Sequence, residues 1–562
     1  MALSMTSCSI RMFRHGGVRS MSTQLSKINS ASTNNLTGER RFYHKGSDNA
    51  GYQRSVQNGA LLLTGAIIGS YGIYKYSQAG AESSMPTVQA KAVKTRVYTA
   101  SEVADHKTPD KGIWVSYKDG VYDITDFVKI HPGGSKIMLG AGGAIDPFWN
   151  LYAVHQTSEV LEMLEEYRIG DLSKRDQKSH KNANDPFGNE PYRFPVFRVN
   201  SAKPFNAEPP LEILTDSFIT PNEMFYVRNH LPVPEVDPET FRLEIVIGPK
   251  SIKYSLEDLK KFQWSTVTTT IQCAGNRREE MSNYKPVKGL SWGASAIGTA
   301  KWTGPRLRDL LMTSGLNPNH PSLKHIQFDG LDCDITNSCY GASIPAKNAL
   351  NHDNDVIVAV KMNGKDIPRD HGYPVRIIVP GVVGARNVKW AHRIVASDEE
   401  SDSHWQQKDY KHFNPSTTYE TADYSKVQSI QELPVTSAIT WPQTNSKVEP
   451  SEDNMVEVQG YAWSGGGRDI IRVDVTSDGG KTWKEADLMK NPEKDDSSQT
   501  WPWTLWKVEM PVKIGQKVQF ACKAVDSSYN QQPETIKPIW NLRGFLSNAW
   551  HRIAVDIVEE VD

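Results

Sequence analysis

One cysteine stands in a sequence context that favours chemistry. Cys273 follows the β-branched run Thr268-Thr-Thr-Ile-Gln and precedes Ala-Gly-Asn-Arg277-Arg278, so a strand is expected to end at a thiol beside two arginines. Neighbouring cations favour the thiolate over the neutral thiol. A thiolate in such a place is a nucleophile or a soft metal ligand, and the alternative for any lone cysteine is an inert buried thiol.

Two histidines have surroundings that suit a haem iron. His131 begins a His-Pro-Gly-Gly turn, which can present an imidazole from a fixed backbone, and His155 ends the apolar and aromatic segment 148–155. Two facing imidazoles fill both axial positions of the iron, so such a haem transfers electrons rather than binding oxygen. The alternative is that His131 only caps a turn and His155 is an ordinary core histidine.

Three further segments combine cations with turn residues. They are residues 226–234, 368–376 and 380–390, and they contain Arg228 and Arg376 among other charged groups. Taken singly, such residues are typical of a solvated surface. Their function therefore depends on whether the fold brings them together.

The elements that must hold these residues change along the chain. Residues 114–117 and 121–124 resemble paired strands around the sequence Lys-Asp-Gly, which predicts a hairpin because Asp-Gly suits the left-handed positions of a tight turn. Residues 158–167 have helical periodicity, with Ser158 as the expected cap. Residues 174–190 are charged and lack an apolar period, so they are expected to form a flexible tether.

The second half of the chain divides into two patterns. Short apolar strands with many Gly and Pro turns indicate an α+β domain of irregular topology, and beyond residue 430 alternating apolar residues with Gly-rich turns predict an immunoglobulin-like β-sandwich. We therefore expect a multidomain α+β chain. Its divisions are residues 1–80, 95–173, 174–190, 191–427 and 428–562.

Composition limits the classes of function. The 562 residues are enough for several domains of about 150 residues each. With 64 Lys and Arg against 65 Asp and Glu, the net charge of -1 gives no support to nucleic-acid binding. Five scattered cysteines argue against a disulfide framework and against a zinc site.

The first residues have the composition of a targeting segment. The first 47 or so are rich in Arg, Lys, Ser and Thr, with Glu39 as their one acid, and an apolar run follows at residues 59–74. That run is shorter than the about 20 residues that cross a bilayer comfortably. The pattern predicts import into mitochondria with cleavage, and a mature protein in the intermembrane space without a membrane anchor. A disordered basic tail is the alternative.

Residues 97–172 resemble the cytochrome b5 family. The resemblance rests on the hairpin, His131-Pro-Gly-Gly, His155 and the closing Tyr167-Arg-Ile-Gly-Asp-Leu172. It implies a domain that binds haem b, with His131 and His155 as the axial ligands.

From residue 186 onward the chain resembles the sulfite oxidase family of molybdenum enzymes. The matching motifs include Gly381-Val-Val-Gly-Ala-Arg386, Ser403-His-Trp405 and the late segment 540–550. The resemblance implies a molybdopterin domain of α+β fold and a dimerising sandwich, with Cys273 as the protein ligand of molybdenum. The implied cofactor contacts are Tyr226, Val227, Arg228, Asn229, His230, Asp332, His371, Arg376, Asn387, Val388 and Lys389.

The same resemblance implies a substrate pocket for sulfite. Sulfite is a small dianion, so its pocket needs several cations and few carboxylates. The residues implied are Arg228, Arg278, Arg543, Lys288, Trp292 and Tyr410.

The implied activity is oxidation of sulfite to sulfate by oxygen-atom transfer, followed by one-electron steps through the haem to cytochrome c in a homodimer. An assimilatory nitrate reductase is a close alternative, but in that family the haem domain follows the molybdenum domain. A second alternative is a haem-binding electron carrier whose molybdenum domain has lost its cofactor. The presence of Cys273 with Arg228, Arg278 and Tyr410 argues against it.

Overall fold

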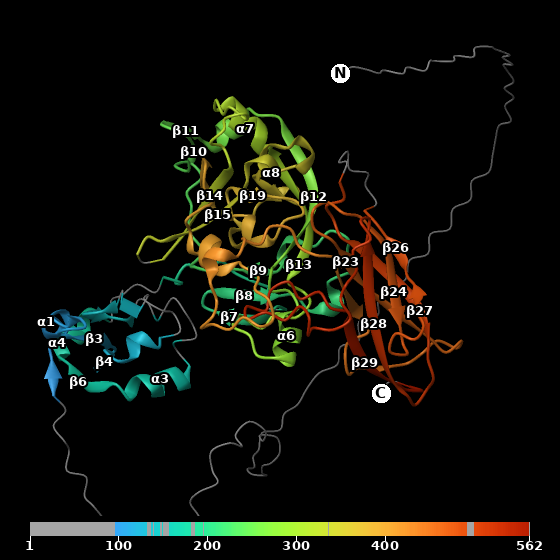
Figure 1. The fold of residues 1–562 in the computed structure, drawn as a ribbon, viewed down its shortest axis with the longest axis horizontal. Helices are drawn as coiled ribbons and strands as arrows, with labels where there is room; N and C mark the ends of the chain where they lie inside the picture. The colour runs from blue at the N-terminus through green and yellow to red at the C-terminus, as the bar shows by residue number, and fades with distance from the viewer. Residues whose placement is uncertain are drawn as a thin grey trace, which may run out of the picture. The chain divides into compact units, whose positions relative to one another are not determined.

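The computed structural model describes residues 96–131, 137–138, 140–146, 149, 155, 157–180, 186–194, 196–334, 336–491 and 499–560 (Figure 1). The expected targeting segment and apolar run lie outside these residues, as does the Pro-Gly-Gly sequence after His131. Within the described residues, no helix has the length and apolar character needed to cross a bilayer.

The first folded unit is built on one sheet with the order β1-β6-β4-β3-β2, with β5 paired to β3. The predicted hairpin is confirmed, because β3 and β4 pair antiparallel. Its turn differs from the prediction: Tyr117 pairs with Gly120, and the left-handed residue is Lys118, with a φ of 51°. A side chain on Gly120 would collide with the ring of Tyr122. The elements are β1 (Val97–Tyr98), α1 (Ala100–Ala104), β2 (Lys107–Thr108), β3 (Gly112–Tyr117), β4 (Gly120–Asp123), η1 (Phe127–Lys129), β5 (Gly143–Ala144), α3 (Ser158–Glu165), β6 (Arg168–Leu172) and α4 (Lys174–His180).

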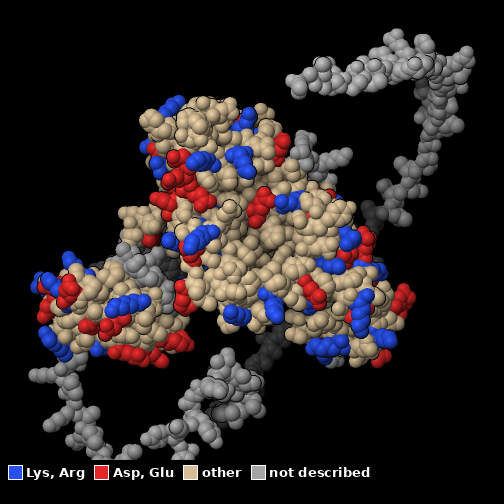
Figure 2. All heavy atoms as spheres, in the orientation of Figure 1, with Lys and Arg blue, Asp and Glu red and all other residues tan. Residues whose placement is uncertain are grey.

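Helix α3 is confirmed with a different start. Thr157 takes the N-cap position, and its side chain makes no capping hydrogen bond, so the expected cap at Ser158 is wrong. Leu164 points into the unit's core, and the opposite face exposes acidic residues. Figure 2 shows these acids along the edge of the unit that α3 forms. The exposed ones are Glu159, Glu162, Glu165 and Glu166.

Helix α4 lies where the composition favoured an irregular tether. Its Gln177 side chain donates to the Leu172 carbonyl at 2.6 Å, and Asp176 accepts from the Ala100 amide at 3.0 Å. Polar contacts rather than an apolar face therefore hold the helix on the first unit. The expectation of irregular chain from residue 174 is wrong for residues 174–180.

The second domain has the expected irregular α+β architecture. Its four sheets have the orders β11-β10-β20-β14-β15, β12-β13-β17-β18, β16-β19 and β7-β8-β9. Its strands are β7 (Arg198–Ala202), β8 (Phe205–Glu208), β9 (Val227–Arg228), β10 (Leu243–Ile247), β11 (Lys250–Tyr254), β12 (Trp264–Gln272), β13 (Ile297–Pro305), β14 (His325–Cys333), β15 (Cys339–Pro345), β16 (Ile357–Ala359), β17 (Lys361–Met362), β18 (Lys365–Asp366), β19 (Arg376–Ile378) and β20 (Ala391–Ser397).

Short helices join these strands. They are η4 (Leu211–Ile213), η5 (Asn222–Met224), α5 (Leu256–Leu259), α6 (Arg278–Tyr284), α7 (Leu307–Thr313), α8 (Ala346–Leu350), η6 (His352–Asn354), η7 (Arg369–His371), η8 (Gly384–Arg386), η9 (Trp405–Asp409) and η10 (Tyr424–Lys426). Cys333 and Cys339 form a disulfide at the end of the β14–β15 pair. The cysteine count had argued against a disulfide framework, and it missed this single bridge because the pairing depends on strand register.

The C-terminal domain is the predicted two-sheet sandwich (Figure 1). One sheet has the order β21-β23-β27-β26 and the other β22-β29-β28-β24-β25. Val458 and Trp506 from the first sheet pack with Val473, Phe520 and Val555 from the second in one apolar cluster. The strands are β21 (Thr436–Trp441), β22 (Lys447–Val448), β23 (Met455–Trp463), β24 (Ile470–Thr476), β25 (Lys484–Glu485), β26 (Asp487–Met489), β27 (Thr504–Pro511), β28 (Lys517–Asp526) and β29 (His551–Ile557).

A buried arginine joins the sandwich to the α+β domain. Arg277 is fully buried and sits in the left-handed region with a φ of 62°. Its guanidinium donates to the Ser437 carbonyl at 3.0 Å and the Ala549 carbonyl at 2.7 Å in the sandwich. It also forms an ion pair with Glu280 at 2.6 Å. The loop that carries Cys273 is therefore fixed against both domains.

Candidate active site

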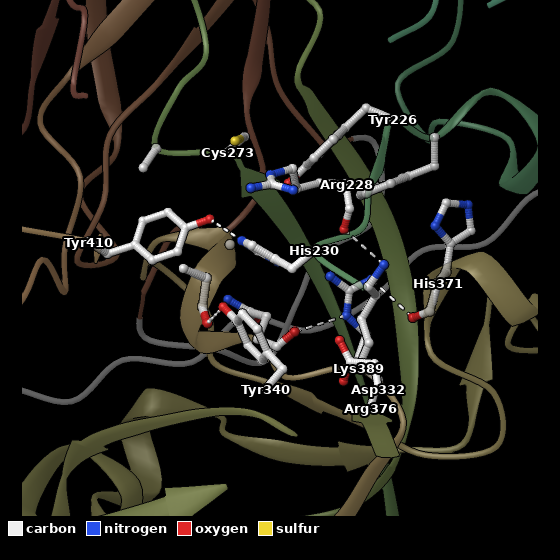
Figure 3. Close-up of a pocket in the computed structure, with 15 residues that line it drawn as sticks. Tyr226, Arg228, His230, Cys273, Asp332, Tyr340, His371, Arg376, Lys389 and Tyr410 are labelled. Atoms are coloured by element: carbon white, nitrogen blue, oxygen red, sulfur yellow. Dashed lines mark hydrogen bonds between the residues drawn. The ribbon is translucent and has the colours of Figure 1, made fainter. Parts of the chain in front are cut away.

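A buried pocket in the α+β domain gathers residues that lie far apart in the sequence (Figure 3). Cys273 follows β12, Asp332 lies near the end of β14, Arg376 begins β19, and Lys389 precedes β20. Most of the residues expected to hold a cofactor line this one cavity. The lining is Phe225, Tyr226, Arg228, His230, Cys273, Ala274, Asp332, Tyr340, His371, Arg376, Gly384, Ala385, Asn387, Lys389 and Tyr410.

Cys273 is a free thiol in the turn that follows β12. Its side chain is buried, its amide donates to the Ala296 carbonyl at 2.9 Å, and its Sγ accepts from the Gly275 amide at 3.4 Å. These contacts hold the sulfur at a fixed place in the pocket wall. The position favours a metal ligand over an inert core thiol, because the neighbouring side chains are charged and polar.

On the opposite wall, burial lowers the pKa values of several basic groups. Burial, followed by the neighbouring Arg376, lowers the pKa of Lys389 to about 7, and burial lowers the pKa of Arg376 to about 10. Burial and then Arg228 hold the pKa of His230 well below its ordinary value. Such a cluster favours a bound anion, because an anion compensates several desolvated cations at once.

Asp332 supplies the acidic counterpart. It is 4% exposed, and its Oδ1 has no hydrogen-bond partner in the described part of the chain. Burial raises the pKa of its carboxyl to about 8, with Lys389 opposing the shift. A buried oxygen without a donor favours a ligand that brings N–H groups. The pocket thus fits molybdopterin, which combines a phosphate, a nitrogen-rich ring and sulfur ligands for a metal.

The expected substrate arginines divide between two places. Arg228 lines the pocket and donates to the Asn206 side chain at 3.1 Å, whereas Arg278 and Arg543 lie beside it and do not line it. The Arg278 Nε donates to the Arg543 carbonyl at 3.1 Å, and both guanidinium groups lie over the ring of Phe545, at 5.0 and 5.3 Å from its centre. Arg543 therefore lies next to Arg278, beside the pocket of its own chain.

Tyr410 connects the pocket to this arginine pair. Its hydroxyl lies 2.7 Å from the Nε2 of His230 (Figure 3), and its ring stacks on Phe545 with centroids 5.2 Å apart. Burial, opposed by Arg228, raises the pKa of its hydroxyl. Asp409, the preceding residue, forms an ion pair with Arg543.

Some predicted residues lie outside the cavity lining. Lys288 places its ammonium 4.6 Å from the centre of the Tyr419 ring, and Trp292 is fully buried against Tyr226. Apart from Arg278 and Arg543, the other predicted pocket residues that do not line it are sequence neighbours of lining residues, namely Val227, Asn229 and Val388.

Tyr340 is a pocket residue that the sequence did not reveal. Its hydroxyl donates to the Ala385 carbonyl at 2.7 Å, and its ring lies 4.7 Å from that of His230. It sits in β15, where a buried tyrosine has the pattern of any core strand. Its neighbour Cys339 was the one sequence feature that could have drawn attention to Tyr340, but a single cysteine does not reveal how β15 pairs with β14.

The first unit contains a separate site. The rings of His131 and His155 are nearly parallel, with an angle of 14° and centroids 6.4 Å apart. Two metal–imidazole bonds of about 2 Å each, together with the ring radii, span a gap of this size. Burial, with the facing His131 second, lowers the pKa of His155 to about 4 and so keeps its imidazole neutral, as an iron ligand must be. The pair thus fits a haem iron between two histidines.

Three family models match successive parts of the chain. They are "Cytochrome b5-like Heme/Steroid binding domain" at residues 99–173, "Oxidoreductase molybdopterin binding domain" at 230–405 and "Mo-co oxidoreductase dimerisation domain" at 427–558. "Sulfite oxidase, mitochondrial" of Homo sapiens is 52% identical over 83% of this chain and 86% of its own length. "Sulfite oxidase" of Gallus gallus is 52% identical over 81% of this chain and 99% of its own.

The chain belongs to the sulfite oxidase family. A solved structure, the sulfane dehydrogenase SoxCD from Paracoccus pantotrophus, has a TM-score of 0.53 at 25% identity and covers 65% of this chain and 86% of its own. The family and the matched domains confirm the expected fold class. They also confirm the two expected cofactors of a sulfite oxidase, molybdopterin in the second domain and haem in the first.

Proposed function

We propose that this chain oxidises sulfite to sulfate at a molybdenum–molybdopterin centre and passes the electrons through its haem to cytochrome c. The observation that carries the proposal is the meeting of a free buried thiol, Cys273, with Arg228 and Tyr410 in one cation-rich pocket. A soft ligand beside an anion site suits a thiolate-bound metal that acts on a small oxyanion.

When bound, the molybdenum centre supplies an oxygen atom to sulfite and takes up two electrons. Cys273 would be its protein ligand. His371, Arg376 and Lys389 would hold the pterin and its phosphate by charge-assisted hydrogen bonds. Asp332 would accept hydrogen bonds from ring N–H groups, because its Oδ1 is buried without a donor among the described residues.

The substrate residues would bind and orient the anion. Arg228 faces the pocket, and Arg278 with Arg543 adds positive charge from the side of the sandwich domain. The Tyr410 hydroxyl, held by His230, would donate to a sulfite or sulfate oxygen. Lys288 and Trp292 would support the substrate-binding residues from outside the cavity, since neither residue lines it.

Electrons would leave the chain through the haem of the first unit. Its paired histidines suit a haem without an open position, and such a haem accepts one electron at a time. The acidic edge of α3 would attract a basic acceptor protein, which supports cytochrome c. The dimerisation domain supports a homodimer. The basic leader and the mitochondrial relatives support a location in mitochondria, and the short apolar run after the leader supports the intermembrane space.

The test is a steady-state assay of sulfite-dependent cytochrome c reduction, with molybdenum and haem quantified on the same sample. We expect activity in proportion to molybdenum content. A sample with full molybdenum and haem that leaves sulfite unchanged would refute the proposal. A sample with haem and no molybdenum after expression in a cofactor-producing host would instead favour the haem-only electron carrier.

A further inference from the structure

The disulfide of the α+β domain lies between two residues of the cofactor pocket. Cys333 directly follows Asp332, and Cys339 directly precedes Tyr340, and both Asp332 and Tyr340 line the cavity. Both cysteines are half-buried, so a small reductant can reach them. The bridge has no part in the family motifs that assign the site.

The hairpin needs such a link because its hydrogen-bond ladder is interrupted at the pocket. Asp329 pairs with Gly341, and the next pair is Cys333 with Cys339. Residues 330–332 of β14 therefore face the single residue Tyr340 of β15, which makes a bulge. A bulge bends its strand and leaves residues without ladder partners, so regular pairing does not fix Asp332 against Tyr340.

The residue in the bulge is costly to keep in place. Asp332 is nearly fully buried, and its Oδ1 has no donor in the described part of the chain. Whenever the cofactor is not in contact with it, this buried carboxyl gains by turning toward water. On the side of β20, the hydrogen bond from the Leu331 amide to the Trp390 carbonyl, at 3.0 Å, opposes this movement. On the side of β15, the disulfide closes the hairpin directly beyond the bulge, next to the hydrogen bond from the Asp334 amide to the Ser338 carbonyl at 3.0 Å.

We propose that the Cys333–Cys339 disulfide is a positioning element of the molybdopterin pocket. By closing the hairpin beyond the bulge, it holds Asp332 and Tyr340 in the pocket wall and slows release of the bound cofactor. The inference rests on molybdopterin as the occupant of the pocket and is independent of sulfite as the substrate.

The experiment measures loss of pterin from the full-length holoenzyme with and without tris(2-carboxyethyl)phosphine. The phosphine takes an oxygen atom from water and becomes the phosphine oxide, and the two electrons and two protons convert the disulfide to two thiols. Released pterin is quantified by fluorescence after oxidation, so the readout does not depend on activity. We expect release to be about ten-fold faster after reduction, because opening a short loop restores chain freedom to the hairpin. Removal of the phosphine and reoxidation should restore slow release.

Two variants separate positioning from general damage. The C333S/C339S double variant should release pterin at the fast rate and should not respond to the phosphine, whereas Cys522→Ala, which removes a buried thiol in the sandwich, should respond as the wild type does. Asp332→Asn should itself speed release, and combining it with C333S/C339S should add less than the sum of the two effects, because both act on one contact. A disulfide that merely stabilised the domain would give additive effects.

Three results would overturn the inference. One is free thiols at Cys333 and Cys339 in peptide maps of the native protein. Another is an unchanged release rate after thiol counting has verified reduction of the wild type, a measurement that needs no variant to fold. The last is full additivity with Asp332→Asn. Failure of sulfite oxidation alone, with normal pterin retention, would count against the proposed function and leave the positioning role untouched.

Discussion

At the level of single residues, the pocket is a set of buried cations that an anion must complete. Burial lowers the pKa of Arg376 to about 10, and burial together with Arg376 lowers the pKa of Lys389 to about 7. A bound phosphate or sulfite removes this penalty. Anion binding should therefore be sensitive to single charge deletions.

Arg228→Gln tests the substrate cation. The change removes a charge that faces the pocket and keeps a similar length, so the loss should appear chiefly as a raised KM with a further fall in kcat. A charge-assisted hydrogen bond is worth roughly 1.5 to 3 kcal/mol, which corresponds to about ten- to a hundred-fold in kcat/KM. Steady-state kinetics with sulfate as inhibitor measures it. Unaltered KM and unaltered sulfate inhibition would place the anion elsewhere.

Cys273→Ser tests the metal ligand. A hydroxyl is a harder and less electron-donating ligand than a thiolate, so turnover should disappear while the fold and the pterin are retained. Circular dichroism, pterin content and molybdenum content provide the controls. Activity near that of the wild type at full molybdenum occupancy would contradict the ligand role.

The sequence reached part of this site and missed part for identifiable reasons. Cys273 and Arg228 stood in segments with a recognisable pattern, and Asp332 was implied by the family resemblance. The structure brings all three into one cavity. Tyr340 and the disulfide were missed, because both depend on how β14 and β15 pair. A single sequence without register cannot place residues 333 and 339 opposite each other.

At the level of elements, the sequence predicted the helices and turns that depend on interactions between neighbouring residues. The β3–β4 hairpin and helix α3 follow from turn residues and periodicity, and both are present. Two details were predicted wrongly. The turn position depends on packing around Tyr122, and the N-cap of the helix is Thr157 rather than Ser158. Helix α4 has no apolar periodicity from which it could be predicted, because hydrogen bonds rather than apolar contacts hold it in place.

The contact between β21 and β29 contains a histidine that should make the folded state less stable at acid pH. The Nδ1 of His551 accepts from the Ile439 amide at 3.1 Å, so the folded state needs a neutral imidazole. Burial, with Arg277 adding to it and Glu280 opposing, lowers the pKa of His551 from 6.5 to about 4. The unfolded chain therefore binds this proton first. The stability contribution is complete above pH 6.5 and is lost as the pH falls toward 4, at about 1.4 kcal/mol per pH unit.

Urea denaturation between pH 7 and pH 4.5, followed by tryptophan fluorescence, measures this slope. The His551→Gln variant, which cannot take up the proton, should have a shallower dependence on pH in the same range. Equal slopes in the two proteins would assign the acid sensitivity to other groups.

At the level of the whole molecule, the haem site and the molybdopterin pocket lie in different domains of one chain, and the proposed electron path connects them. His131→Ala or His155→Ala should remove the low-spin haem spectrum and cytochrome c reduction, because an iron with one imidazole is weakly held. Sulfite oxidation by an artificial two-electron acceptor should survive, since the pocket around Cys273 is unchanged. Absorbance spectra and the two assays on the same preparation make the comparison. Cytochrome c reduction by a variant shown to be free of haem would disprove the route.

The buried contacts of Arg277 limit how freely evolution or engineering can exchange the parts of this chain. A different β-sandwich grafted after residue 427 would offer no carbonyls at the places of Ser437 and Ala549, and the buried guanidinium would keep Glu280 but lose these two acceptors. Such a chimera would also lose Arg543 and Phe545 from beside the pocket. The sandwich and the α+β domain should therefore be exchanged together as one unit, because the loop that carries Cys273 is held by acceptors from both.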